Sequence, residues 1–149
     1  MAPKPMQSSI RIAAEPALVF ERITDLSGHE AFTDHFLIDW RDTSADHVNV
    51  CAKVPGPEDR ADVDVVEREP PHRLVEQLVA AKGKRRARST WMLEPDGDGT
   101  IVTFATEQQA TPAAERLVAP LTRRWIQRGN DRALERLRDL VEAGRPAGD

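Results

Sequence analysis

The spacing of hydrophobic residues changes along the chain, and each change predicts a different type of element. Apolar and polar residues alternate over 8–13, which predicts a half-buried strand. From Pro16 onward apolar residues recur at helical spacing, so a helix follows this strand. Ser27 and Gly28 interrupt the helical spacing, and a second short helix is expected to run to about Phe36.

The middle of the chain returns to alternation, which indicates consecutive antiparallel strands joined by turns. The strands are expected at 38–42, 47–54, 60–68, 73–80, 84–93 and 100–108. Glycine and proline separate them, because glycine adopts positive φ at little cost and proline fixes φ while removing a donor. The turns are expected at 55–57, 70–71, 82–83 and 95–99.

A long amphipathic helix is predicted to follow Pro112 and to end at about Ala143. Its apolar stripe consists of Val118, Leu121, Trp125, Leu134, Leu137 and Val141. Pro120 predicts a short helix followed by a longer one, because proline breaks or kinks a helix interior. Gly129 lies within the helix at a cost of about 1 kcal/mol relative to alanine. Either another element approaches it closely or it is a tolerated surface glycine.

The chain has 149 residues, of which 40% are hydrophobic and 31% charged, values typical of one folded domain. We expect this domain to span 8–144, between disordered tails at 1–7 and 145–149. Acidic residues outnumber basic ones by 25 to 21, so nucleic acid is not an expected partner.

The cysteine count and the hydropathy of the chain bear on its location. The single cysteine, Cys51, cannot form an internal disulfide, so the count does not indicate an oxidising compartment. Residues 1–9 lack the apolar stretch of a signal peptide, and no apolar run approaches the roughly 20 residues that span a bilayer. The expectation is a cytoplasmic protein without an integral membrane segment.

The order of predicted elements resembles the helix-grip fold of the START-like (SRPBCC) superfamily, in particular its polyketide cyclase/dehydrase and lipid transport branch. The segments that carry the resemblance are Ser9–Ile12 with Pro16 and Val19–Phe20 at the start of the first helix, Glu69–Val75, Trp91–Pro95 and Gly99–Phe104. The resemblance implies an α+β fold in which a curved antiparallel sheet of about seven strands wraps a long C-terminal helix. It also implies a cavity that accepts a lipid, a polyketide or an isoprenoid-like molecule. A curved sheet cannot pack flush along one helix, which makes such a cavity physically reasonable.

Inward-facing positions are the candidates for the wall of this cavity. On the strands they are Trp40, Val50, Val63, Val65, Leu78, Trp91 and Phe104, and on the last helix Trp125. For each of them a place in an ordinary hydrophobic core is the favoured alternative. Arg86, in the basic segment 82–88, could anchor a carboxylate or phosphate. The alternative, which we favour, is a solvated strand face paired with the acidic strand of Asp62 and Asp64.

His29 and His35 are the histidines of the short-helix region, where the entrance of the cavity is expected. Together with Asp34 they do not share one helical face, so the spacing argues against a metal site. A role as acid or base is an alternative, but solvent-exposed side chains explain both histidines better. No cofactor or metal is expected.

The resemblance leaves the activity open. Binding or transport of an apolar small molecule is the favoured hypothesis. Cyclases and aromatases of the superfamily commonly use cavity tyrosines and arginines, whereas this chain has no tyrosine. A polyketide cyclase or dehydratase that uses general acid/base catalysis is therefore the alternative. A protein-interaction module is a second alternative, and the oligomeric state and the ligand stay open.

Overall fold

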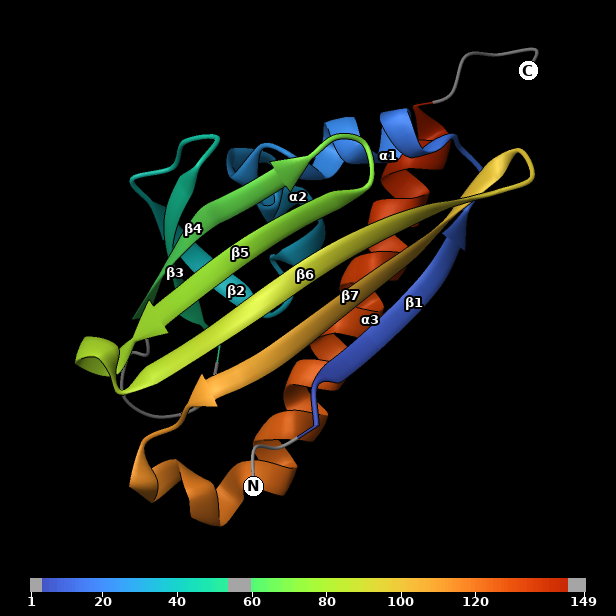
Figure 1. Ribbon diagram of the computed structural model, residues 1–149. Helices are drawn as coiled ribbons and strands as arrows, with labels where there is room; N and C mark the ends of the chain where they lie inside the picture. Colours follow the sequence, from blue (N-terminus) through green and yellow to red (C-terminus); the bar gives the residue numbers. More distant parts are fainter. Residues whose placement is uncertain (1–3, 54–59, 145–149) are drawn as a thin grey trace.

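The computed structural model describes residues 4–53 and 60–144 (Figure 1). Within them seven strands form one antiparallel sheet in the order β1-β7-β6-β5-β4-β3-β2. Consecutive strands are neighbours, except that β1 pairs with β7, so the predicted meander is confirmed. The strands are β1 (Met6–Ile12), β2 (Leu37–Arg41), β3 (His47–Ala52), β4 (Arg60–Glu69), β5 (Arg73–Ala80), β6 (Arg85–Asp96) and β7 (Gly99–Ala110).

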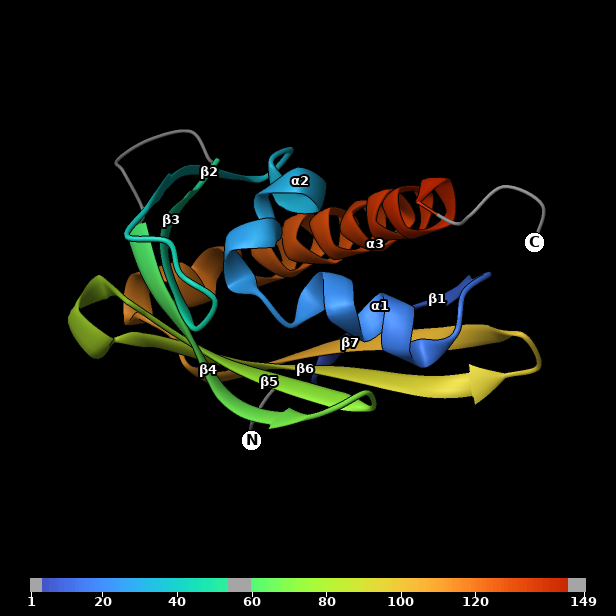
Figure 2. The same ribbon diagram turned by 90° about the horizontal axis from the view of Figure 1, so that it is seen from above.

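The helices lie on one face of this sheet, as Figure 2 shows. They are α1 (Pro16–Ile23), η1 (Leu26–Gly28), α2 (Glu30–Thr33), η3 (Ala113–Val118) and α3 (Ala119–Ala143), and η2 (Ala81–Gly83) joins β5 to β6. In the same view β2 and β3 rise from the plane of the other strands toward α2 and α3. The predicted helix-grip arrangement, with a curved sheet against a long C-terminal helix, is confirmed. Among the described helices none is both long and apolar enough to span a membrane.

The main hydrophobic core fills the space between the sheet and the inner faces of α1, α2 and α3. Its largest fully buried members include Ile12, Phe32, Leu74, Val102 and Leu137. Burial of each such side chain stabilises the fold by about 1.5–3 kcal/mol. A smaller cluster of Leu26, Val48 and Val50 lies under the raised strands β2 and β3.

Polar contacts fix α3 against the edge strand β1. Ser8 Oγ donates to Asp131 Oδ1 at 2.6 Å, and the backbone nitrogen of Ala13 donates to Glu142 Oε2 at 2.9 Å. Both carboxylates lie on α3, so the helix is held near both ends of β1.

Several element boundaries differ from the sequence-based expectation. β1 begins at Met6, so Met6 and Gln7 belong to a strand rather than to a disordered tail. β6 and β7 extend into the expected turn at 95–99, and Pro95 pairs with Thr100 because β6 continues to Asp96. Val54 and the expected turn at 55–57 lie outside the described residues, as do 1–3 and 145–149 of the expected tails.

The C-terminal helical region divides at Pro120 as predicted. A 3-10 helix, η3, precedes the 25-residue α3, and the proline occupies the first turn of α3, where its missing donor costs no hydrogen bond. Gly129 is buried, and a Cβ placed there would lie 2.8 Å from Phe36 Cδ2. Of the two explanations for this glycine, close approach of another element is correct.

Candidate functional site

A cavity of about 1390 Å³ lies between the concave face of the sheet, α2, η3 and α3. Its wall is mostly apolar and includes Phe32, Phe36, Val48, Ile126 and Leu134. The volume exceeds the roughly 300–1,000 Å³ of typical small-molecule pockets. The raised strands and the helix therefore leave room that side chains do not fill.

Eight of the nine sequence-predicted positions line this cavity: Trp40, Val50, Val63, Leu78, Arg86, Trp91, Phe104 and Trp125. Val65 is not part of the wall. It packs against both hydrophobic clusters instead. That any of these residues contacts a ligand stays a prediction.

Two arginines at the start of β6 line the cavity, and they do so differently. Arg86 is exposed and contributes to the rim of the wall. Arg85 is more enclosed and forms an ion pair with Glu115 of η3 at 2.5 Å. Arg85 lies an even number of residues before Trp91, so strict alternation along β6 places these two side chains on the same side of the strand. Arg85 was not among the cavity positions expected from the sequence, although alternation counted from Trp91 indicates it.

The expected pairing of the basic segment with the acidic strand is wrong. β5 lies between β4 and β6, so the two charged strands are not neighbours. Asp62 Oδ1 instead accepts a hydrogen bond from Asn49 Nδ2 at 2.8 Å. Asp64 Oδ1 lies 2.7 Å from His47 Nδ1. Both partners are on β3.

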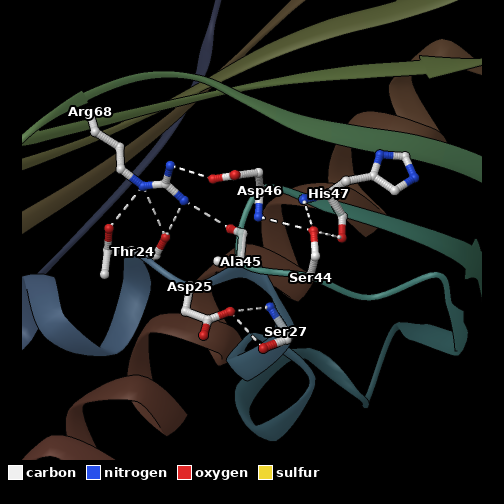
Figure 3. Close-up of polar contacts among 8 residues, drawn as sticks. All are labelled: Thr24, Asp25, Ser27, Ser44, Ala45, Asp46, His47 and Arg68. Atoms are coloured by element: carbon white, nitrogen blue, oxygen red, sulfur yellow. Dashed lines mark hydrogen bonds and ion pairs between the residues drawn. The ribbon is translucent and has the colours of Figure 1, made fainter.

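His29 is buried against the cavity, with 6% of its surface exposed, so the expectation of a solvent-exposed side chain is wrong. Its Nε2 donates to the carbonyl oxygen of Ile23 at 2.7 Å. Asp25 shapes the preceding turn: its Oδ1 accepts from the Ser27 hydroxyl at 2.6 Å and from the Ser27 nitrogen at 2.9 Å (Figure 3). These hydrogen bonds lower the pKa of Asp25. The turn directs residue 29 toward the sheet, which helical spacing alone could not predict.

Glu76 of β5 is a buried carboxyl group in the wall of the cavity, and it was not among the positions expected from the sequence. Its Oε1 lies 3.6 Å from His29 Nδ1. Burial raises the pKa of Glu76, while the nearby His29 and the indole of Trp91 oppose this effect. The signal in the sequence was a charged residue at an inward position between Leu74 and Leu78.

Trp91 of β6 stands beside this carboxyl group and is held by other rings. The centroid of Phe104 lies 4.4 Å from that of Trp91, and the centroid of His29 lies 5.9 Å away. Trp91 Nε1, Glu76 Oε1 and Asn130 Nδ2 are buried without a hydrogen-bond partner in the described part of the chain. Each such group costs roughly 1–3 kcal/mol when unpaired.

His35 is half-buried and connects α2 to α3, so it is not a free surface side chain either. Its Nε2 donates to the carbonyl oxygen of Gly129 at 2.9 Å, and its Nδ1 lies 3.0 Å from Arg136 Nη1. The same guanidinium contacts Asp34 at 2.5 Å, and this hydrogen bond lowers the pKa of Asp34. Within 4–53 and 60–144 no three His, Cys, Asp or Glu side chains are grouped as metal ligands.

Arg68 of β4 contacts the end of α1 and the loop between β2 and β3 (Figure 3). Its guanidinium donates to the Thr24 carbonyl at 2.7 Å and to the Ala45 carbonyl at 2.9 Å. It also forms an ion pair with Asp46 at 2.5 Å. One side chain thus joins the end of α1 to the loop between β2 and β3.

At η3 the cavity wall includes exposed residues. Val118 lines the cavity and is 47% exposed, and its neighbours Leu117 and Leu121 are 89% and 67% exposed. The cavity therefore reaches the surface at the junction of η3 and α3, on a rim of apolar side chains.

Comparisons with known proteins agree with this architecture. The sequence profile described as polyketide cyclase / dehydrase and lipid transport matches residues 5–142. No curated protein matches the sequence. The structure is similar to that of TTHA0849 from Thermus thermophilus, with a TM-score of 0.74, 21% identity, and coverage of 95% of this chain and 99% of that chain.

Two further solved structures have the same fold. CalU16 from Micromonospora echinospora has a TM-score of 0.60 and 20% identity, over 91% of this chain and 74% of that chain. DynU16, a protein of the dynemicin biosynthetic locus, has a TM-score of 0.61 and 19% identity, over 97% of this chain and 49% of that chain. At these identities the likeness concerns the fold.

Proposed function

We propose that this chain, which belongs to the polyketide cyclase / dehydrase and lipid transport family, binds an apolar small molecule between the sheet and α3. The observation that carries the proposal is the cavity of about 1390 Å³ with a mostly apolar wall. Apolar walls with a few placed polar groups are typical of small-molecule sites. The ligand class is a lipid, a polyketide or an isoprenoid-like molecule.

Two measurements test this function. Native mass spectrometry of freshly purified protein is expected to reveal a co-purified small molecule. Titration with the fluorescent hydrocarbon 1-ethylpyrene is expected to show saturable binding with one site per chain, because binding removes the apolar surface of the probe from water. If 1-ethylpyrene and a thermal-shift panel of lipids and aromatic polyketides all fail to bind, the proposal is wrong.

Catalysis is the second candidate, and the pair of His29 and Glu76 favours it. General acid/base chemistry needs a titratable group in the cavity, and burial raises the pKa of Glu76. In a dehydration, a base removes a proton from the carbon next to a carbonyl group, and an acid protonates the departing hydroxyl group, so that water leaves. His29 Nδ1 and the Glu76 carboxyl group are the chain's candidates for these two roles.

This second candidate is tested with a β-hydroxyketone of polyketide type, whose loss of water is followed by mass spectrometry. Turnover by the wild-type protein that is abolished in Glu76→Gln, with 1-ethylpyrene binding unchanged, would support catalysis. The exposed Glu94 of β6 provides the control variant Glu94→Gln. Turnover that persists in Glu76→Gln would exclude the assigned role.

A further inference from the structure

Two polar atoms in the cavity wall indicate the chemistry of the ligand. Glu76 Oε1 and Trp91 Nε1 are buried without a hydrogen-bond partner among the described residues. Their residues are only 7% and 3% exposed, and both line the cavity. The carboxyl oxygen accepts a hydrogen bond, whereas the indole nitrogen can only donate one. An unpaired acceptor and an unpaired donor therefore stand in the same apolar wall.

The two groups do not pair with each other, and His29 forms no hydrogen bond with either of them. The indole N–H lies near enough to the Glu76 carboxyl group to act as a weak donor that favours its ionised form, but no hydrogen bond of ordinary geometry joins Nε1 to Oε1. His29 Nε2–H is already donated to the Ile23 carbonyl, and its Nδ1 lies 3.6 Å from Glu76 Oε1, beyond hydrogen-bond range. The imidazole also packs against Phe32, with ring centroids 4.9 Å apart, so it is held in this orientation. The acceptor and the donor are left for a guest.

We propose that Glu76 and Trp91 form a subsite that binds a hydroxyl group of an otherwise apolar ligand. The inference rests on the proposed function, because the subsite requires a guest in the cavity. A hydroxyl oxygen accepts from the indole N–H, and its proton is donated to Glu76 Oε1. One neutral group thus satisfies both wall atoms.

Other head groups do not fit these two atoms. A hydrocarbon leaves both unpaired, and that state is unfavourable for buried polar groups. A carboxylate or a phosphate has no proton to donate when ionised, and it would bring a negative charge beside a buried carboxyl group. The subsite therefore selects alcohols and phenols over acids of the same carbon skeleton.

The test compares three probes of nearly equal size in fluorescence titrations with the wild-type protein: 1-pyrenemethanol, 1-ethylpyrene and 1-pyrenecarboxylate. In a purely apolar cavity the alcohol would bind more weakly than the hydrocarbon, because its hydroxyl group would be buried unpaired. We expect the alcohol to bind at least as tightly as the hydrocarbon and more tightly than the carboxylate.

Two variants assign the selectivity to the named atoms. Trp91→Phe keeps an aromatic ring but removes the donor, and it is expected to weaken 1-pyrenemethanol about three- to tenfold relative to 1-ethylpyrene. Glu76→Leu removes the acceptor and is expected to act in the same direction. Glu94→Leu, at an exposed position of β6, is the matched control and should leave the ratio of the two affinities unchanged.

The possible failures are distinguishable. If 1-ethylpyrene binds but the alcohol is disfavoured, or if the carboxylate is preferred, the subsite is overturned while binding in the cavity stands. An equal weakening of both neutral probes in Trp91→Phe would also overturn the subsite. If no probe binds the wild-type protein, the proposed function and the subsite fail together. The wild-type comparison needs no variant, so it holds even where a substitution prevents folding.

Discussion

Glu76 makes the stability of the protein depend on pH in a direction opposite to that of an ordinary surface carboxylate. Burial raises its pKa in the folded state above the ordinary value of about 4.3. At pH values between the ordinary pKa of the unfolded state and the raised pKa of the folded state, the folded state binds more protons than the unfolded state. The free energy of unfolding therefore falls as pH rises through this window. Glu76→Gln cannot ionise. We therefore expect the free energy of unfolding of Glu76→Gln to increase relative to wild type from about pH 4 to about pH 8, measured by urea denaturation.

The matched control for this prediction is Glu94→Gln, at an exposed position on the neighbouring strand. Its stability difference from wild type should change far less over the same pH range. A constant difference between wild type and Glu76→Gln at all pH values would contradict the prediction, since it would mean that the Glu76 carboxyl group titrates alike in both states.

At the scale of elements, Arg68 joins α1 to the loop between β2 and β3 through Thr24, Ala45 and Asp46. Its side chain is 30% exposed, and hydrogen bonds from charged donors contribute about 1.5–3 kcal/mol when they are well formed. Arg68→Ala is expected to lower the free energy of unfolding by about 2 kcal/mol. Chemical denaturation measures this loss. Arg132→Ala, at an exposed position of α3, serves as control and should change stability by less than about 0.5 kcal/mol.

At the scale of the whole molecule, the cavity can be filled from within. Ala87 of β6 lines it, and Ala87→Trp places an indole where a guest would lie. Because the space is empty, the added side chain should not incur the 1–3 kcal/mol or so that overpacking costs in a filled core. We expect a melting temperature close to that of wild type and a loss of affinity for 1-ethylpyrene of about tenfold or more.

The control for the filled cavity is Met92→Trp on the same strand, because Met92 points outward and is 45% exposed. It adds the same ring outside the cavity and should bind the probe like wild type. If Ala87→Trp folds and keeps full affinity, the probe binds elsewhere and the assigned cavity is wrong.

Local spacing in the sequence was sufficient for the order of elements. Alternation predicted the strands of the meander, and Pro120 predicted the division between η3 and α3, because both depend on neighbouring residues along the chain. The same spacing also identified Trp91 and Phe104, which line the cavity. It could not show that Arg85 meets Glu115, because η3 and β6 are brought together only by the fold.

What the sequence by itself determined was the type and succession of elements, since the period of apolar residues is a local property. Only the tertiary structure brought His29 to Glu76 and left Trp91 Nε1 without a partner among the described residues. Burial, charge state and unpaired polar atoms depend on surroundings contributed by distant segments, and these exist only after the sheet has closed over the helices. The cavity depends on packing for the same reason. Its volume is the space between the sheet and the helices that no side chain fills.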